Sequence, residues 1–224
     1  MIEIKICGMT NLDDALAVAE SGADALGFIF YPKSPRYVSP EKAKKIIENL
    51  PARITRVGVF VNHGADEIKE IVDFCGLNLV QLHGSESPEY CRQFPASIVI
   101  KAFSPRTEND LQLLKDYNVK AILVDTHNPK LYGGTGKISN WGLASEIRKL
   151  YPLILSGGLN IDNIVEAIKT VHPNAVDINS GVESSPGEKD HNKIKKIIDI
   201  VRRNDRHKDR EEDVIFNDHV KFNT

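Results

Sequence analysis

Eight short apolar runs alternate with eight helix-like segments along most of this sequence, and no other feature constrains the fold as strongly. The runs are rich in Val, Ile and Leu and span residues 2–6, 25–30, 56–61, 79–83, 98–102, 121–125, 153–156 and 175–178. The segments that follow them have apolar residues at helical spacing and span residues 11–21, 40–50, 65–75, 87–94, 108–117, 141–150, 160–169 and 191–203. Strands of this kind, joined by helices, are typical of a parallel sheet covered by helices.

Eight such units in about 200 residues predict a single-domain α/β protein over residues 1–203, a closed (β/α)8 or TIM barrel. An open, doubly wound sheet is the alternative. That fold would place a Gly-x-Gly-x-x-Gly turn after the first strand, whereas the glycine-bearing turns here come late, after the last two strands. We interpret residues 204–224, which include a dense run of mixed charge, as a solvated and flexible extension. Its apolar groups, residues 214–216 and 220–222, could dock as a short strand or bind a partner.

The composition excludes several functional classes. The 224 residues have a net charge of −2, which gives no case for general attraction to nucleic acid or membranes. The first residues lack the basic start of a signal peptide, and no run of about 18 apolar residues is present, so we expect a cytoplasmic protein. The three cysteines are too far apart for a disulfide framework or a zinc knuckle, and the scattered histidines predict no metal site.

In such a barrel the catalytic groups lie at the carboxyl ends of the strands and in the loops that follow them. Cys7 directly follows the first run, and by the two-residue period of a strand it shares the more polar face with Glu3 and Lys5. A lone cysteine is more often a small core residue than a reactive group, so its position alone leaves both interpretations open. Gln81 and His83 end the fourth run and point inward by the same parity, either lining the mouth of the barrel or contacting a substrate.

Two glycine-bearing turns follow the seventh and eighth runs. The first contains Gly157 and Gly158 ahead of a helix, and the second contains Ser180 and Gly181. Residues without a Cβ let the backbone approach an anion closely, and the N–H groups at a helix start favour negative charge. A single glycine-bearing turn is usually only a tight turn. Two such turns after the seventh and eighth strands match the phosphate site of many barrel enzymes. We therefore predict phosphate binding there.

Two charged residues complete the candidate site. Asp125 ends the sixth run and precedes a glycine-rich loop, residues 126–137. At a partly desolvated rim such a carboxyl group can act as a general acid, although it can equally serve as an N-cap or in a rim ion pair. Arg36 lies in the basic, proline-stiffened loop 31–40, and its planar guanidinium suits a substrate carboxylate.

Six motifs occur along the chain in a fixed order. They are Lys5-Ile6-Cys7-Gly8-Met9-Thr10 and those at residues 27–37, 57–62, 80–84, 155–159 and 177–183. From residue 1 to about residue 203 they resemble the phosphoribosylanthranilate isomerase family of tryptophan biosynthesis. The resemblance implies conversion of N-(5-phosphoribosyl)anthranilate to 1-(2-carboxyphenylamino)-1-deoxyribulose 5-phosphate. This Amadori rearrangement is an aldose–ketose isomerisation, an intramolecular oxidation and reduction that needs no cofactor. The implied partner is a small phosphosugar, and the enzyme is a monomer or a homodimer.

The resemblance also implies roles for individual residues. Cys7 is the general base and Asp125 the general acid, and Arg36 binds the anthranilate carboxylate. The phosphate turns are Gly157, Gly158, Ser180 and Gly181. Contact of Gln81 and His83 with the substrate stays open, and Lys5 is the first candidate for a cation that helps the Cys7 thiol to lose its proton.

Two rival functions remain at this point. An aldose–ketose isomerase of histidine biosynthesis resembles this fold but uses two aspartates, so Cys7 argues against it. A non-catalytic phosphosugar-binding barrel would use Cys7 as a core residue. Turnover of the substrate separates the two classes.

Overall fold

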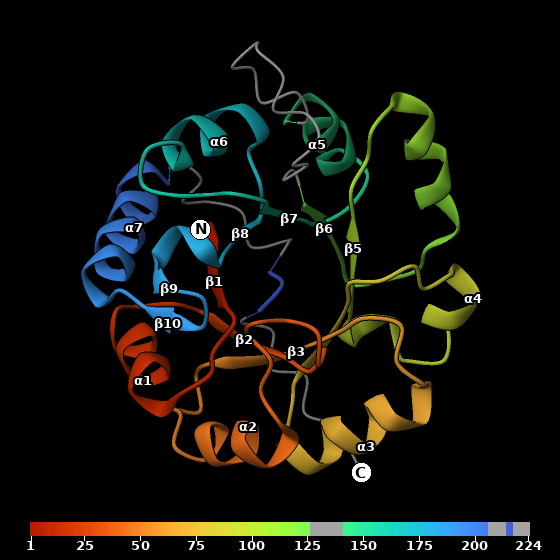
Figure 1. Ribbon diagram of the computed structural model, residues 1–224. Coiled ribbons are helices and arrows are strands. Elements are labelled where there is room, and N and C mark those ends of the chain that lie inside the picture. The colour runs from red at the N-terminus through yellow and green to blue at the C-terminus, as the bar shows by residue number, and fades with distance from the viewer. Residues whose placement is uncertain (126–140, 206–213, 217–224) are drawn as a thin grey trace.

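Eight parallel strands close into a barrel with the helices outside it, as the computed structural model shows (Figure 1). The structure describes residues 1–125, 141–205 and 214–216. Each strand pairs with the next along the chain, and the last pairs with the first. The strands are β1 Glu3–Cys7, β2 Ala25–Ile29, β3 Thr55–Phe60, β4 Leu79–Leu82, β5 Val99–Phe103, β6 Ala121–Asp125, β7 Leu153–Ser156 and β8 Ala175–Ile178. The predicted (β/α)8 barrel is confirmed, and the open sheet is excluded.

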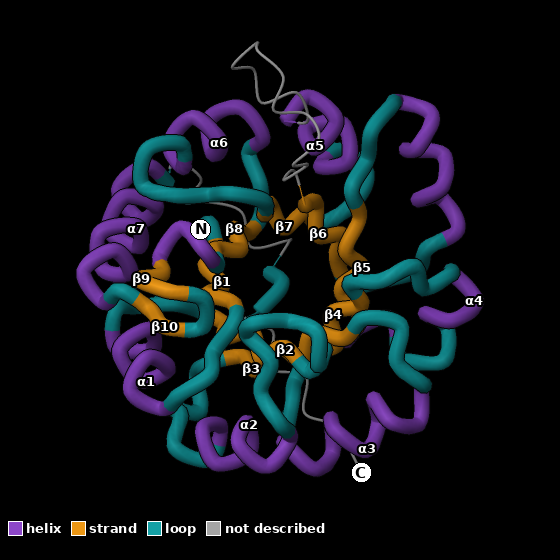
Figure 2. The backbone as a smooth tube through the Cα atoms, viewed as in Figure 1, coloured by secondary structure: helices purple, strands orange, loops and turns teal. Residues whose placement is uncertain are grey.

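The helices form an outer layer around the ring of strands (Figure 2). They are α1 Leu12–Glu20, α2 Pro40–Ile47, α3 Ala65–Cys75, α4 Pro88–Cys91, α5 Trp141–Arg148, α6 Ile164–Val171 and α7 His191–Asn204. Side chains cap several of them: Ser39 accepts a hydrogen bond from the backbone of Lys42, and Asp190 accepts two at the start of α7. Among the described residues no helix has the length and apolar content needed to cross a bilayer.

Several predicted helices end earlier than expected, α4 at Cys91 instead of residue 94, and two others differ in type or in first residue. Residues 108–117 are predicted as an α-helix, but Glu108–Asp116 forms a 3-10 helix. Its Leu111 and Leu114 pack toward the core at a spacing of three residues, which a helix with three residues per turn brings onto one face. The helix predicted to begin at residue 160 begins at Ile164, because the Asn163 side chain accepts the backbone N–H of Asn160 and holds the intervening residues in a turn.

The two faces of β1 separate as the two-residue period predicts. Ile4 and Ile6 are fully buried in the core cluster, whereas Lys5 and Cys7 point into the barrel. The interior of the barrel therefore has polar groups along its axis.

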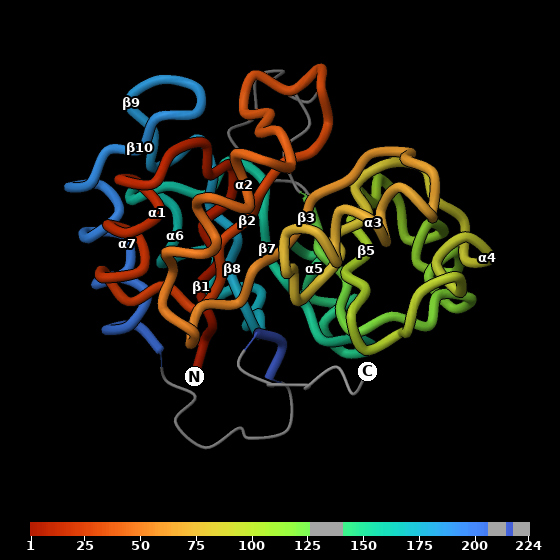
Figure 3. Tube along the Cα trace, turned by 90° about the horizontal axis from the view of Figure 1, so that it is seen from below, coloured from red at the N-terminus to blue at the C-terminus, as the bar shows by residue number. Residues whose placement is uncertain are grey.

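A short hairpin that the sequence did not predict lies beside the carboxyl ends of the strands. It consists of β9, Glu183–Ser185, and β10, Glu188–Lys189, and follows a 3-10 turn at Ser180–Val182. Seen from the side, this hairpin and the N-terminus lie at opposite ends of the barrel (Figure 3).

The sequence predicts a boundary at residue 203 between the barrel and the rest of the chain. That division stays a prediction, because most of residues 204–224 lie outside the described residues. Two of them that the structure does describe, Ile215 and Phe216, are buried in the core.

Candidate active site

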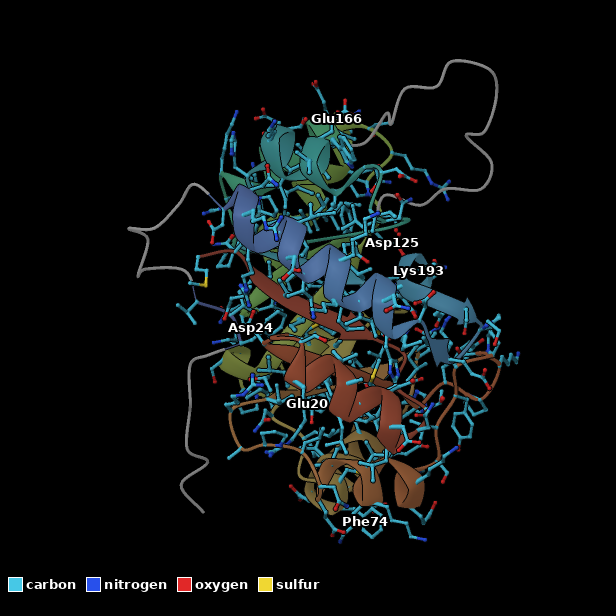
Figure 4. The ribbon with its side chains drawn as sticks, turned by 90° about the vertical axis from the view of Figure 1, so that its left-hand side faces the viewer. Glu20, Asp24, Phe74, Asp125, Glu166 and Lys193 are labelled. Carbon is cyan, nitrogen blue, oxygen red and sulfur yellow. The ribbon has the colours of Figure 1, made fainter. Side chains whose placement is uncertain are left out.

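A cavity of about 360 Å³ opens at the carboxyl end of the barrel. It brings together all but one of the predicted site residues: Cys7, Arg36, Gln81, His83, Asp125, Gly157, Gly158 and Ser180. Asp125 lies toward this end of the barrel, and Asp24 lies toward the other (Figure 4). The glycine-rich loop predicted to follow Asp125 falls outside the described residues.

The thiol of Cys7 sits opposite a position that has no side chain. Cys7 pairs in register with Gly27 of β2. A Cβ at residue 27 would lie 2.7 Å from the Cys7 Sγ, closer than packed atoms allow, and 3.1 Å from the Lys5 Nζ, which is a tight contact. Gly27 therefore provides the space in which the thiol and the ammonium group meet.

Directly below Cys7 in the barrel, Lys5 and Asp177 form a buried ion pair. The two residues pair in register between β1 and β8, and Lys5 Nζ lies 2.8 Å from Asp177 Oδ2. Burial alone would lower the pKa of Lys5, but the Asp177 carboxylate and the Cys7 thiol outweigh it, so the pKa is raised above its ordinary value. Lys5 is therefore a permanent cation beneath the cavity.

The same surroundings keep the Cys7 thiol protonated. Burial raises the pKa of Cys7, and the positive charges of Lys5 and Lys189 only partly oppose that effect. Lys5 does act on Cys7 in the predicted direction, but the pKa of the thiol stays above its usual range. The thiolate is consequently the minor form at neutral pH.

The first of the two predicted phosphate turns, after β7, has a backbone conformation that requires glycine. Gly157 and Gly158 have φ values of 91° and 67°, in the left-handed region that favours glycine. The side-chain amides of Asn160 and Asn163 donate to the Gly158 carbonyl at 3.1 and 3.0 Å and so fix the orientation of this turn.

Gly181 is the one predicted residue that does not line the cavity. It packs behind the wall, where a Cβ would overlap the carbonyl oxygen of Leu159. Its role is therefore to let the turn after β8 touch the turn after β7.

Arg36 is already engaged by a carboxylate. Its Nε lies 2.8 Å from Glu183 Oε1 and its Nη2 lies 2.6 Å from Oε2, while Nη1 donates to no other described residue. Hydrogen bonding to Glu183 raises the pKa of Arg36. Burial alone would raise the pKa of Glu183, but Arg36 and Lys189, whose Nζ lies 2.9 Å from Oε1, lower it below its usual range.

A chain of side chains connects β4 with β6. Gln81 Nε2 lies 2.8 Å from His83 Nδ1, and His83 Nε2 lies 3.7 Å from Asp125 Oδ2. An amide donor at Nδ1 leaves the proton of a neutral imidazole on Nε2, facing Asp125. Asp125 therefore has a loose contact with His83 at the rim of the cavity, and this contact is an ion pair only when the imidazole is protonated.

Sequence reasoning gave no role to Asp177, Glu183 or Lys189. Asp177 and Glu183 lie in the motif at residues 177–183, which was the signal available for them. Two residues that line the cavity each have a buried oxygen, Gln81 Oε1 and Asp177 Oδ1, that accepts no hydrogen bond within the described part of the chain. Among those same residues, no three His, Cys, Asp or Glu side chains are grouped as metal ligands.

The model of the N-(5'-phosphoribosyl)anthranilate isomerase family matches residues 4–200. A curated N-(5'-phosphoribosyl)anthranilate isomerase from Syntrophus aciditrophicus is 59% identical over 203 residues, which are 91% of this chain and 88% of that protein.

Two solved structures are similar to this one. Phosphoribosyl anthranilate isomerase from Thermotoga maritima superposes with a TM-score of 0.82 at 46% identity, over 90% of this chain and 99% of that one. A phosphoribosyl anthranilate isomerase in complex with reduced 1-(o-carboxyphenylamino)-1-deoxyribulose 5-phosphate gives a TM-score of 0.77 at 46% identity, over 88% of this chain and 97% of that one.

Proposed function

This chain belongs to the N-(5'-phosphoribosyl)anthranilate isomerase family and is an isomerase of tryptophan biosynthesis, and we propose that Cys7 and Asp125 carry out its two proton transfers. They stand on β1 and β6, with β7 and β8 between them around the barrel. The two phosphate turns follow these intervening strands. A substrate anchored there by its phosphate would present its ribose to both groups.

The two ends of the substrate have separate anchors in this proposal. The phosphate binds at Gly157, Gly158 and Ser180, with Gly181 holding the two turns together. The anthranilate carboxylate binds the Nη1 side of Arg36, whose guanidinium Glu183 fixes in one orientation. The distance between the anchors sets the length of substrate that fits.

The reaction then needs two proton movements. Asp125 donates a proton to the furanose oxygen as the bond between that oxygen and C1 breaks, giving an open-chain Schiff base. The Schiff base acidifies C2, and the Cys7 thiolate removes the C2 proton to give an enolamine. The Asp125 carboxylate then takes up the enol proton and the Cys7 thiol gives a proton to C1, which yields the ketose and returns both groups to their starting states. Because no electrons leave the substrate, the proposed reaction needs no cofactor.

Gln81, His83 and Asp177 position the ribose. Gln81 Oε1 and Asp177 Oδ1, which accept no hydrogen bond from the residues that the structure describes, are suited to accept hydrogen bonds from its hydroxyl groups, because a buried acceptor without a donor is costly. His83 offers its Nε2 proton to Asp125 or to the substrate. These assignments extend the earlier expectation for Gln81 and His83 and add Asp177.

The observation that carries the proposal is the convergence of Cys7, Asp125, Arg36 and the two phosphate turns on one cavity. Purified protein should convert phosphoribosylanthranilate without added metal or nucleotide. Complementation of a tryptophan auxotroph that lacks this isomerase, with and without residues 204–224, tests the function in a cell, where we place the enzyme in the cytoplasm. No conversion at any protein concentration would contradict the assignment.

A further inference from the structure

A segment near the C-terminus, residues 214–216, is packed into the amino-terminal end of the barrel. Ile215 and Phe216 are each 1% exposed and belong to the main core cluster, whereas Val214 is 40% exposed. Along the barrel axis this segment lies inside the ring of strands (Figure 1), and from the side it lies near the N-terminus, away from the β9–β10 hairpin (Figure 3). It therefore occupies the end opposite the cavity.

The barrel meets the backbone of this segment with polar groups. Glu3 Oε2 accepts the N–H of Ile215 at 2.6 Å, and Glu3 Oε1 accepts the N–H of Phe216 at 3.0 Å. The hydroxyl of Thr55 donates to the carbonyl oxygen of Phe216. Glu3 and Thr55 are 5% and 6% exposed. A carboxylate so deeply buried is costly unless donors satisfy it, and the two amides are such donors.

The face of β1 that carries Glu3 continues to the catalytic end of the barrel. Glu3, Lys5 and Cys7 share the inward face of β1, so they form successive layers along the axis. Phe216 and Ile215 lie at the Glu3 layer, below the Lys5–Asp177 pair. The segment thus lies on the amino-terminal side of that pair, opposite the cavity.

The segment lies beyond residue 200, where the family match ends. Of its partners, Thr55 on β3 lies within the match, whereas Glu3 on β1 lies one residue before it. A segment beyond the matched region therefore donates hydrogen bonds to a buried carboxylate at the start of the barrel.

We propose that the amino-terminal end of the barrel is a binding site for an extended peptide, and that its resident ligand is residues 214–216 of the same chain. Glu3 selects the ligand because its carboxylate pairs with two consecutive backbone N–H groups. The core cluster into which residues 215 and 216 pack selects two large apolar side chains. A proline at position 215 or 216 would lack one of the donors.

Hydrogen exchange on the full-length protein tests the proposal without relying on isomerase activity. The amides of Ile215 and Phe216 should exchange at least about a hundredfold more slowly than those of an unstructured peptide. In Glu3→Gln the protection of these two amides should fall. The amide of Leu123 in β6 should keep its protection, which would show that the segment is released while the barrel stays folded. Unprotected amides at 215 and 216 in the unmodified chain would overturn the proposal.

Thermal unfolding of full-length variants provides a second, independent readout. Phe216→Ala should lower the midpoint by about 10 °C, because it leaves a cavity in the core. Val214→Ala removes apolar atoms from the same segment at an exposed position and should leave the midpoint unchanged. Equal midpoints for the two variants would overturn the proposal. So would a midpoint that rises with protein concentration, because a second copy would then supply the segment.

Discussion

The guanidinium of Arg36 and the carboxylate of Glu183 form an ion pair with two parallel hydrogen bonds, at 2.8 and 2.6 Å. The pair joins the loop after β2 to the start of β9 and sets the orientation of Arg36 at the edge of the cavity. A guanidinium held in this way loses little conformational entropy when a second carboxylate binds it.

We expect Arg36→Ala to act mainly on substrate affinity. Loss of a charged hydrogen bond to the anthranilate carboxylate should raise KM about tenfold to a hundredfold while kcat changes less. Steady-state kinetics of the purified variant measure both. Arg92→Ala is the matched control, because Arg92 is an exposed arginine paired with Glu89 away from the cavity. An unchanged KM in Arg36→Ala would contradict the contact.

The raised pKa of Cys7 predicts how its reactivity depends on pH. Because only the thiolate is alkylated and burial keeps the thiol protonated, the rate of modification by iodoacetamide should still rise about tenfold per pH unit beyond the ordinary thiol pKa of about 8.5. The rate is measured at Cys7 itself by mass spectrometry of the peptide that contains it. A plateau below about pH 8 would show a lowered pKa instead.

Lys5→Met tests whether the positive charge of Lys5 limits the rise in the pKa of Cys7. Removal of the positive charge beside the thiol should raise the pKa of Cys7 further and slow its alkylation at about pH 9 by about tenfold. The control is Lys101→Met, since Lys101 forms a comparably buried pair with Glu86, 2.9 Å apart, at residues that do not line the cavity. Both variants leave a buried carboxylate without its partner and should lose about 3–5 kcal/mol of stability. Equal alkylation rates in the two variants would show that Lys5 does not affect the pKa of Cys7.

Gly181→Ala tests the contact between the two phosphate turns. An added Cβ would overlap the Leu159 carbonyl and push the turns apart, so inhibition by inorganic phosphate should weaken about tenfold or more. Gly64→Ala adds the same methyl group where no atom lies within 4 Å and should leave phosphate inhibition unchanged. Normal phosphate inhibition in Gly181→Ala would mean that the turns do not form one site.

The sequence predicted all eight strands, because buried parallel strands are near-continuous apolar runs that need no knowledge of their partners. The helix boundaries were less predictable. The side chains of Asn160 and Asn163 compete with the helix for backbone groups, and this competition moved the start of α6 to Ile164.

Residues at strand ends could be assigned to the cavity from parity and fold alone, as Cys7, Gln81, His83 and Asp125 show. Contacts between residues far apart in the sequence could not be predicted in this way. Arg36 and Glu183 are 147 positions apart, and Glu3 and Phe216 are 213 apart. Nothing in the local sequence indicates these pairings, because register and loop packing in the folded chain create them.

The most direct test of the central claim is the turnover of Cys7→Ser and Asp125→Asn, measured beside Cys91→Ser, which alters a buried cysteine outside the cavity. If Cys7 and Asp125 transfer protons, kcat should fall about 10²–10⁴-fold in each of the first two variants. Affinity for the phosphate-bearing product should stay within about threefold, and Cys91→Ser should keep normal turnover. Near-normal kcat in either Cys7→Ser or Asp125→Asn would contradict the account.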